Sequence, residues 1–275
     1  MSLDTYNFTR ATVVADSIGD SVESRVITFV LTYPRFIHGQ MMTHRMAARN
    51  AQSSRAVPVA KMISQVLEDP VVPVEFLENI KGMVGGRPLD VNSDARATWL
   101  LASVDAAESA EQLRAAGVHK QHANRILEPY LTITSVFTFE AKWLTHFFGL
   151  RLEHDAQPEI QSLARKMHMA AQASTPIRLW GGQWHTPLMT PSERVTMDAS
   201  QLSKCSAARC ARASYLNFEG GRDPKKDIAL YTMLVADEHM SPLEHVLTPA
   251  PQGVYGVFEN WESLRFQCEN PLPQG

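Results

Sequence analysis

The chain has 275 residues, 44% hydrophobic and 20% charged, a composition typical of a globular protein with a substantial core. Its 26 Lys and Arg against 29 Asp and Glu give a formal net charge of −3, which argues against a broadly basic surface for nucleic acid or acidic membrane. Three cysteines without a Cys-x-x-Cys pair, and no leader-like or membrane-spanning apolar run, predict a cytoplasmic chain without a disulfide framework.

The first half of the chain mixes strand and helix patterns. Residues 26–33 (VITFVLTY) are rich in β-branched and aromatic side chains and predict a buried strand, which Pro34 ends. Residues 36–48 are predicted to form a helix, and the polar residues 49–58 a turn. Residues 59–118 favour helices on either side of a Gly/Pro-rich loop, and we interpret them as a peripheral helical insertion.

The second half has one strand pattern among helices. Residues 118–127 and 155–173 predict helices, the latter from apolar residues at helical spacing, and residues 132–139 predict a strand. Residues 174–202, rich in Pro, Gly and Thr, are expected to form an ordered loop, and 224–238 an amphipathic helix. Because strands and helices do not alternate regularly, the pattern favours an α+β fold.

The densest group of polar residues begins at Gln40. On a helix, Gln40 and His44 share a face because they are four residues apart. The hydroxyls of Ser53 and Ser54 and the guanidinium of Arg55 follow in a short polar loop, and such a loop can bind a phosphate. The alternative is a solvated helix end with ordinary capping.

A second group surrounds Arg151. This arginine follows the apolar stretch WLTHFFGL, so its charge needs a partner if it is buried. The partner is either a carboxylate, such as Glu153 or Asp155, or an anionic substrate. Other basic residues precede it in the sequence: Arg125, Lys142 and His146.

A third group is His239-Met-Ser241-Pro242-Leu-Glu244-His245. Ser241 as N-cap, Pro242 as the first helical residue and Glu244 as the third would form a capping box. A helix start flanked by two histidines is also suited to hold an anion or the edge of a cofactor.

Two further patterns are weak. His119 and His122 have the spacing of metal ligands, but no third ligand follows at a sensible distance, so no metal is expected. Cys210 lies beside Arg209, which could lower its pKa, although a small buried core residue is the better interpretation.

Together these segments resemble the flavin-dependent thymidylate synthases (ThyX type). The signature of that family is Arg-His-Arg, seven residues and then Ser; Thr43-His44-Arg45 followed by Ser53 matches all but the first position. Three other segments resemble family motifs in the same way. They are NRILEP with Leu150-Arg151 and DAQPEI (155–160), SAARCARASY (206–215), and HMSPLEH (239–245).

The order of these motifs differs from that of the family, in which the last two come first. A circular permutation is the simplest interpretation, since close surface termini tolerate it. The tail, 246–275, is interpreted as a decayed duplicate of 26–50, with chance matching as the alternative. The spacing aligns three tail residues, Asn260, Arg265 and Asn270, with Gln40, Arg45 and Asn50.

The resemblance implies a single α+β domain over 1–275, with a central, mostly antiparallel sheet flanked by helices. It implies a homotetramer with active sites shared between subunits, and no binding of nucleic acid or membrane. The implied reaction transfers a methylene group from methylenetetrahydrofolate to C5 of dUMP, with FAD as cofactor and NADPH as reductant where the reaction is reductive.

The resemblance also implies roles for particular residues. Gln40, Ser53, Ser54, Arg55 and Arg125 would hold the nucleotide, chiefly its phosphate, while Arg151 would face the pyrimidine and make C5 nucleophilic. The FAD site would be lined by His44, Arg45, Lys142, His146, Ser241 and Glu244. The implied catalytic residues are Arg151, His44 and His239, the last near flavin and folate.

Three departures leave the activity open. Thr43 replaces an arginine, Ala51 a glutamate, and Asp155 a histidine of the family pattern. One hypothesis is an ordinary thymidylate synthase. The second is 5-hydroxymethylation of dCMP or dUMP, with water quenching the exocyclic methylene, as a phage with modified DNA would require in its host's cytoplasm. The third is a flavin- or nucleotide-binding protein without catalysis.

Overall fold

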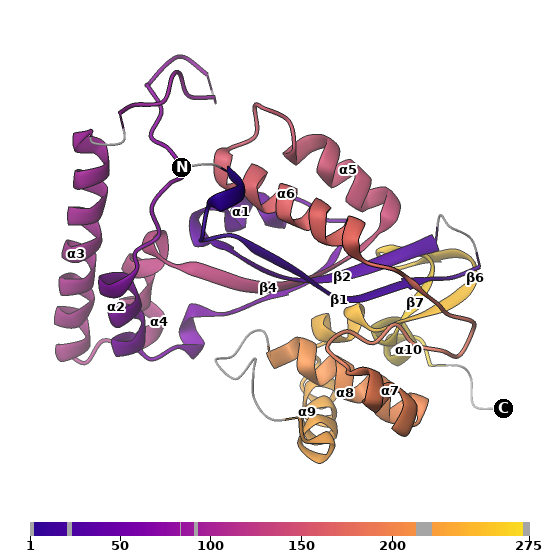
Figure 1. The fold of residues 1–275 in the computed structure, drawn as a ribbon. Helices are drawn as coiled ribbons and strands as arrows, with labels where there is room; N and C mark the ends of the chain where they lie inside the picture. The colour runs from indigo at the N-terminus through magenta and orange to yellow at the C-terminus, as the bar shows by residue number, and fades with distance from the viewer. Residues whose placement is uncertain (1–2, 21–23, 83, 91–92, 213–221, 272–275) are drawn as a thin grey trace.

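The computed structural model describes residues 3–20, 24–82, 84–90, 93–212 and 222–271. Its centre is a five-stranded sheet in the order β3-β4-β2-β1-β5 (Figure 1), antiparallel throughout except for the parallel pair β1 and β5. The mostly antiparallel α+β prediction is therefore confirmed. The strands are β1 (Arg10–Ile18), β2 (Arg25–Pro34), β3 (Ala48–Ala51), β4 (Thr132–Glu140) and β5 (Ile177–Arg178).

Alternation along the two longest strands builds two different faces. In β2, Ile27, Phe29 and Leu31 point to one face, and β4 adds Phe137 and Phe139 to it. Two helices, α5 (Ala141–Arg151) and α6 (Pro158–Ala173), cover this face and complete the main hydrophobic core (Figure 1).

A second layer covers the opposite face of the sheet (Figure 1). Trp261, fully buried, packs there against Val26 of β2 and Ala48 of β3, and its indole N–H donates to the Ser24 carbonyl at 2.8 Å. The layer therefore belongs to the folded core of the protein. It consists of α7 (Pro191–Thr196), α8 (Ala199–Ala211), α9 (Pro224–Ala236), η7 (Ser241–His245), the hairpin of β6 (Leu247–Tyr255) and β7 (Phe258–Ser263), and α10 (Leu264–Glu269).

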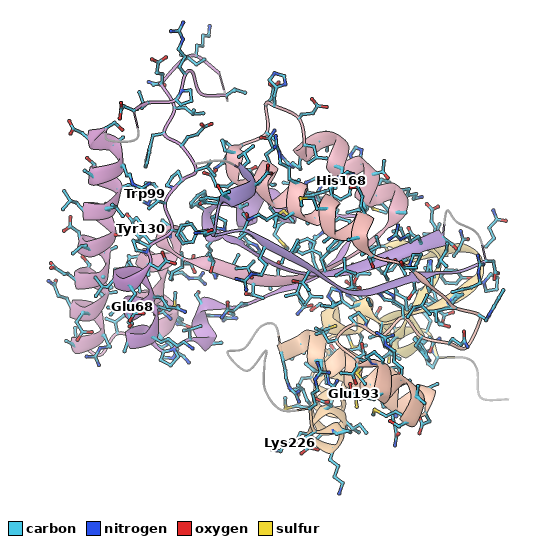
Figure 2. The ribbon with its side chains drawn as sticks, viewed as in Figure 1. Glu68, Trp99, Tyr130, His168, Glu193 and Lys226 are labelled. Carbon is cyan, nitrogen blue, oxygen red and sulfur yellow. The ribbon has the colours of Figure 1, made fainter. Side chains whose placement is uncertain are left out.

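The predicted helical insertion lies at one end of the molecule (Figure 1). Trp99 packs edge-on against Tyr130 with ring centroids 5.4 Å apart, and its indole N–H donates to the Val71 carbonyl at 2.8 Å (Figure 2). The helices predicted within 59–118 are confirmed, and they share one apolar cluster with the segment that follows. The elements are α2 (Val59–Glu68), α3 (Asp94–Ala115), α4 (Lys120–Ala123) and the 3-10 segment η5 (Asn124–Tyr130).

The helix predicted over 36–48 is wrong beyond its first turns. The short η3 (Arg35–Ile37) and α1 (His38–Met42) end at Met42, and Ala48 begins β3 instead. Backbone groups along the edge of β4 require partners, and residues 48–51 pair with them from Ala48 opposite Thr138 to Ala51 opposite Ser135. This long-range pairing overrides the local helical pattern.

Two other parts of the fold differ from the prediction. The strand β1 was not predicted, although it pairs along β2 for most of its length. Residues 174–202 are more than a loop, because they contain β5, α7 and the start of α8. The capping box of α7, in which Thr190 and Glu193 bond each other's backbone, was a sequence signal for this helix. The strand of 132–139 and the helices of 155–173 and 224–238 are confirmed within a few residues.

The tail differs in element order from the unit it was predicted to duplicate. Residues 26–50 form a strand, a short helix and the start of β3, whereas the described part of 246–275 forms a hairpin followed by α10. Asn260 lies in β7 and accepts from the Gly253 N–H, while its predicted counterpart Gln40 lies in α1. The duplication and the circular permutation stay predictions.

Candidate functional site

Arg151, the last residue of α5, lies against the segment that follows α1. Its Nε donates to Nε2 of His44 at 3.0 Å, and its Nη2 lies 3.4 Å from the Thr43 hydroxyl. Neither Glu153 nor Asp155 is its partner, and Asp155 pairs with His154 at 2.6 Å. No carboxylate of the described residues forms an ion pair with Arg151, and burial lowers its pKa. Among the described residues, the hydrogen-bond partners of its guanidinium are therefore uncharged groups, the His44 ring and the Thr43 hydroxyl.

His44 is held as a neutral ring. Its imidazole packs edge-on against Phe147 with ring centroids 4.7 Å apart. Burial first, and then the charges of Arg151, His146 and Arg49, together lower its pKa to about 4. Because Nε2 accepts from Arg151, the proton of the neutral ring lies on Nδ1. The neighbourhood of His44 is therefore strongly positive.

Gln40 lies in α1 but does not share a helix face with His44, because α1 ends at Met42. Its Nε2 donates to Oε1 of Gln157, whose own amide donates to Glu159 at 2.8 Å. The buried Glu159 in turn accepts from the Val74 N–H at 2.8 Å. Gln157 was not singled out from the sequence, although the DAQPEI segment that contains it was.

The predicted phosphate loop is fixed by a buried asparagine that the sequence did not reveal. Asn124 Nδ2 donates to the carbonyls of Ser54 at 2.8 Å and Val57 at 2.9 Å, and so joins η4 (Ser54–Ala56) to η5. Arg125, the next residue, is exposed and pairs with Glu128 at 2.8 Å. The structure thus gathers four predicted nucleotide residues into one group: Ser53, Ser54, Arg55 and Arg125.

Replacing Asn124 with alanine should lower the free energy of unfolding by about 2 kcal/mol, because two carbonyl groups lose their donors in a buried place. Chemical denaturation of the variant and of wild type measures the change. Gln121→Ala in α4, at an exposed position, is the matched control and should stay within about 0.5 kcal/mol of wild type. Equal stability of N124A and wild type would show that the two bonds do not hold the loop.

Residues predicted for the FAD site divide into two sets. The first set has no ion pair with a described carboxylate: His44 is half-buried, and the others, Arg45, His146 and Ser241, are exposed. Lys142 forms an ion pair with Glu259 of β7, and Glu244 forms one with Arg265 of α10 at 2.7 Å. The second-layer tail therefore supplies the partners of two predicted cofactor residues.

The predicted capping box at Ser241 is wrong. Ser241 is the first residue of η7 and makes no capping bond, and Met240 occupies the cap position. Glu244 turns to Arg265 instead of the helix start, and burial raises its pKa. The predicted catalytic residue His239 is exposed.

A buried hydrogen-bond chain crosses the second-layer face of the sheet and joins it to β3. Its members are buried or half-buried polar groups, and each is bonded to the next. Asn50 at its end is the neighbour of Arg49, so the chain fixes β3 beside His44. The bonds are Ser17–His185 2.8 Å, His185–Thr28 2.8 Å, Thr28–Thr138 2.6 Å, Thr138–His245 2.8 Å, His245–Asn50 2.6 Å and Asn50 to the Cys210 carbonyl 2.7 Å.

Donor and acceptor roles along this chain follow from its last bond. The Cys210 carbonyl can only accept, so Asn50 donates to it and accepts from Nε2–H of His245. Thr138 then donates to Nδ1 of His245, and the same reasoning gives His185 a proton on Nε2. Both histidines are neutral, since burial lowers the pKa of each to about 3.

The SAAR segment has a structural role in this fold. Arg209 is buried and pairs with Glu193 at 2.7 Å and with Asp227 at 3.0 Å, joining α7, α8 and α9. Cys210 is buried, as predicted for a core residue, and burial raises its pKa. The last residues of the motif, 214 and 215, lie outside the described residues.

The described residues lack both a metal-binding cluster and a membrane-crossing helix. They contain no cluster of three or more His, Cys, Asp or Glu that could hold a metal ion. His119 accepts from the Gln121 N–H at the start of α4. No described helix has both the length and the apolar character that crossing a membrane requires.

More than half of the chain matches the model of a known protein family. The model of the family described as "Thymidylate synthase complementing protein" matches residues 9–177. A flavin-dependent thymidylate synthase of Streptomyces coelicolor is 27% identical over 171 residues, which are 58% of this chain and 65% of that protein. One from Thermococcus onnurineus is 29% identical over 147 residues, 53% of this chain and 54% of the relative. The chain thus spans less than two thirds of these relatives.

Solved structures give a more distant likeness. A UMP/dUMP methylase of Streptomyces cacaoi bound with 5-Br UMP has a TM-score of 0.48 at 19% identity, covering 59% of this chain and 88% of that one. The same methylase bound with 5-Br dUMP has a TM-score of 0.43 at 23% identity, covering 54% and 67%.

Proposed function

The chain belongs to the thymidylate synthase complementing protein family, and on that premise we propose that it transfers a one-carbon unit from methylenetetrahydrofolate to C5 of dUMP, forming dTMP. The observation that carries the proposal is the unpaired guanidinium of Arg151, which lies 3.0 Å from the ring of His44 without a carboxylate partner among the described residues. Such a cation suits a substrate whose ring gains negative charge as C5 reacts.

Two groups of residues would divide the recognition of the nucleotide. Ser53, Ser54, Arg55 and Arg125 would bind the phosphate through hydroxyls, backbone N–H groups and guanidinium forks. Arg151 and Gln40 would face the base. We propose that the two groups meet in active sites shared between the subunits of a homotetramer.

The residues present fit a cofactor that carries a diphosphate. Arg45 and His146 are exposed, and no carboxylate is among the groups that shift the pKa of His44 beside them. His44, Arg45, His146 and Ser241 would hold FAD, with Lys142 and Glu244 already engaged by Glu259 and Arg265. Bound flavin would supply the redox chemistry, with NADPH as the reductant. The exposed His239 would border the folate.

The neighbours of Arg151 and His44 determine the chemical role that each of the two residues can have. Neutral His44 orients the Arg151 guanidinium by accepting from Nε, and Phe147 holds the His44 ring in place. Arg151 keeps its proton, because the His44 ring that accepts from its Nε is far too weak a base to remove it, and Arg151 acts by polarising the pyrimidine. We also propose a cytoplasmic location, because all three cysteines are unpaired.

Product analysis tests the proposed function. Purified protein is incubated with FAD, methylenetetrahydrofolate and dUMP, with and without NADPH, and the nucleotides are identified by mass. We expect dTMP that forms only when NADPH is present. A hydroxymethyl product without a reductant, or a product from dCMP in a parallel reaction, would replace this assignment. No product from either nucleotide would contradict it.

A further inference from the structure

The segment that follows α1 is approached by two guanidinium groups from different elements. Arg151 of α5 reaches the ring of His44 and the Thr43 hydroxyl, as described above. Arg49 of β3 reaches the same segment from the sheet edge, and its Nη1 donates to the His44 carbonyl at 2.8 Å. Arg49 lies in the polar stretch that follows His44, but no role was predicted for it from the sequence.

One hydrogen bond leaves most of the Arg49 guanidinium for another ligand. Arginine has five N–H donors, and the contact to the His44 carbonyl uses one of them. No described carboxylate forms an ion pair with Arg49. Glu244 feels its charge at a distance, but Glu244 itself is paired with Arg265 at 2.7 Å.

The position of Arg49 is fixed from the opposite side of the strand. Its neighbour Asn50 accepts from His245 at 2.6 Å and donates to the Cys210 carbonyl at 2.7 Å. Because successive side chains of a strand point to opposite faces, this anchor turns Arg49 toward the face that carries His44. Backbone pairing of β3 with β4, with Arg49 opposite Phe137, sets its height along the sheet.

Two guanidinium cations meet at a segment that carries no charge of its own. Arg49 and Arg151 each bring a positive charge to residues 43–44, where His44 is neutral and Thr43 carries no charge. A doubly charged phosphate between them would bring opposite charges together and satisfy several donors at once. Thr43 stands where the Arg-His-Arg signature of the family has an arginine, and Arg49 brings a cation to the same segment from a different element.

We propose that Arg49 is a phosphate-binding residue of the active site and supplies the positive charge that position 43 lacks. The ligand is the phosphate of the pyrimidine nucleotide or the diphosphate of the flavin. The inference rests on the proposed function for the identity of these ligands, and it does not depend on which product the enzyme forms.

Direct binding tests the proposal. Wild type, Arg49→Gln, the double variant Thr43→Arg with Arg49→Gln, and the control Arg96→Gln on the exposed surface of α3 are titrated separately with dUMP and with FAD. Calorimetry follows dUMP, and quenching of flavin fluorescence follows FAD. We expect R49Q to weaken one of the two ligands about 10- to 100-fold, and the affected ligand identifies the phosphate that is bound.

The double variant separates charge from folding. Returning a cation at position 43 should recover at least half of the lost binding energy, which a role of Arg49 in holding the backbone would not predict. R96Q should bind like wild type, and thermal unfolding checks that every variant is folded. Unchanged binding of both ligands by folded R49Q would overturn the proposal, as would failure of wild type to bind either. Absence of dTMP with the binding loss intact would overturn only the proposed reaction.

Discussion

Replacing Arg151 with alanine should lower kcat/KM for dUMP by about 10³-fold or more. The variant removes a half-buried cation that has no carboxylate partner among the described residues. A hydrogen bond from its Nε to neutral His44 orients this cation. Loss of one preorganised donor at a centre of developing negative charge costs on the order of 10² to 10³ in rate, and Arg151 offers more than one donor. Steady-state kinetics of dTMP formation measures the effect.

Arg165→Ala in α6 is the matched control, because the Arg165 side chain is 43% exposed and lies 3.7 Å from Asp4 in a surface ion pair. This control should keep the kcat/KM of wild type within about twofold. The fold of R151A is checked by thermal unfolding. Turnover of folded R151A at the wild-type rate would refute the assignment of Arg151 to the nucleotide.

The buried hydrogen-bond chain should make the protein sensitive to acid. His185 and His245 are fully buried, and burial holds the pKa of each near about 3, below the ordinary value of 6.5. Between these two pKa values, both histidines are therefore protonated in the unfolded chain and neutral in the folded chain. Stability from each histidine is fully present above pH 6.5 and is lost as pH falls toward 3. At pH 5 each loss is roughly 2 kcal/mol.

A variant comparison isolates this contribution. Glu140 acts in the opposite direction, because burial raises its pKa to about 7, so the total pH dependence combines both effects. His245→Gln keeps a donor for Asn50 and an acceptor for Thr138 but does not titrate. Between pH 7.5 and pH 5, we expect H245Q to lose about 2 kcal/mol less unfolding free energy than wild type loses.

His154→Gln is the control for this comparison, since the His154 side chain is 89% exposed. Its pH dependence should match that of wild type. Nitrogen NMR of the histidine rings gives a second test, because both buried rings should carry their proton on Nε2 at pH 5. Charged rings at that pH, or equal pH dependence of H245Q and wild type, would contradict the assigned chain.

Local patterns were sufficient for the elements that carry them. The β-branched run of β2, the alternation of β4 and the helical spacing of α6 were each predicted to within a few residues. The helix over 36–48 failed because the edge of β4 offers residues 48–51 backbone partners that no local pattern reveals. The short β3 that results is what places Arg49 beside His44.

The candidate site residues come from motifs, whereas the contacts that position them come from segments distant in the chain. Gln40, His44, Ser53 and Arg151 follow from the resemblance, whereas Asn124 and Gln157 act through partners distant in the chain. The partners of Lys142 and Glu244 come from the tail, Glu259 and Arg265, so the sequence suggested cofactor residues where the fold has ion pairs.

Release of the hydrogen at C5 of dUMP is the most direct measure of one-carbon transfer to that carbon. The protein is incubated with FAD, NADPH and dUMP tritiated at C5, and tritium in water is counted with and without methylenetetrahydrofolate. We predict release that requires methylenetetrahydrofolate, is equal in amount to the dTMP formed and is absent in R151A. Tritium retained in the nucleotide by folded wild-type protein with all components present would contradict the account.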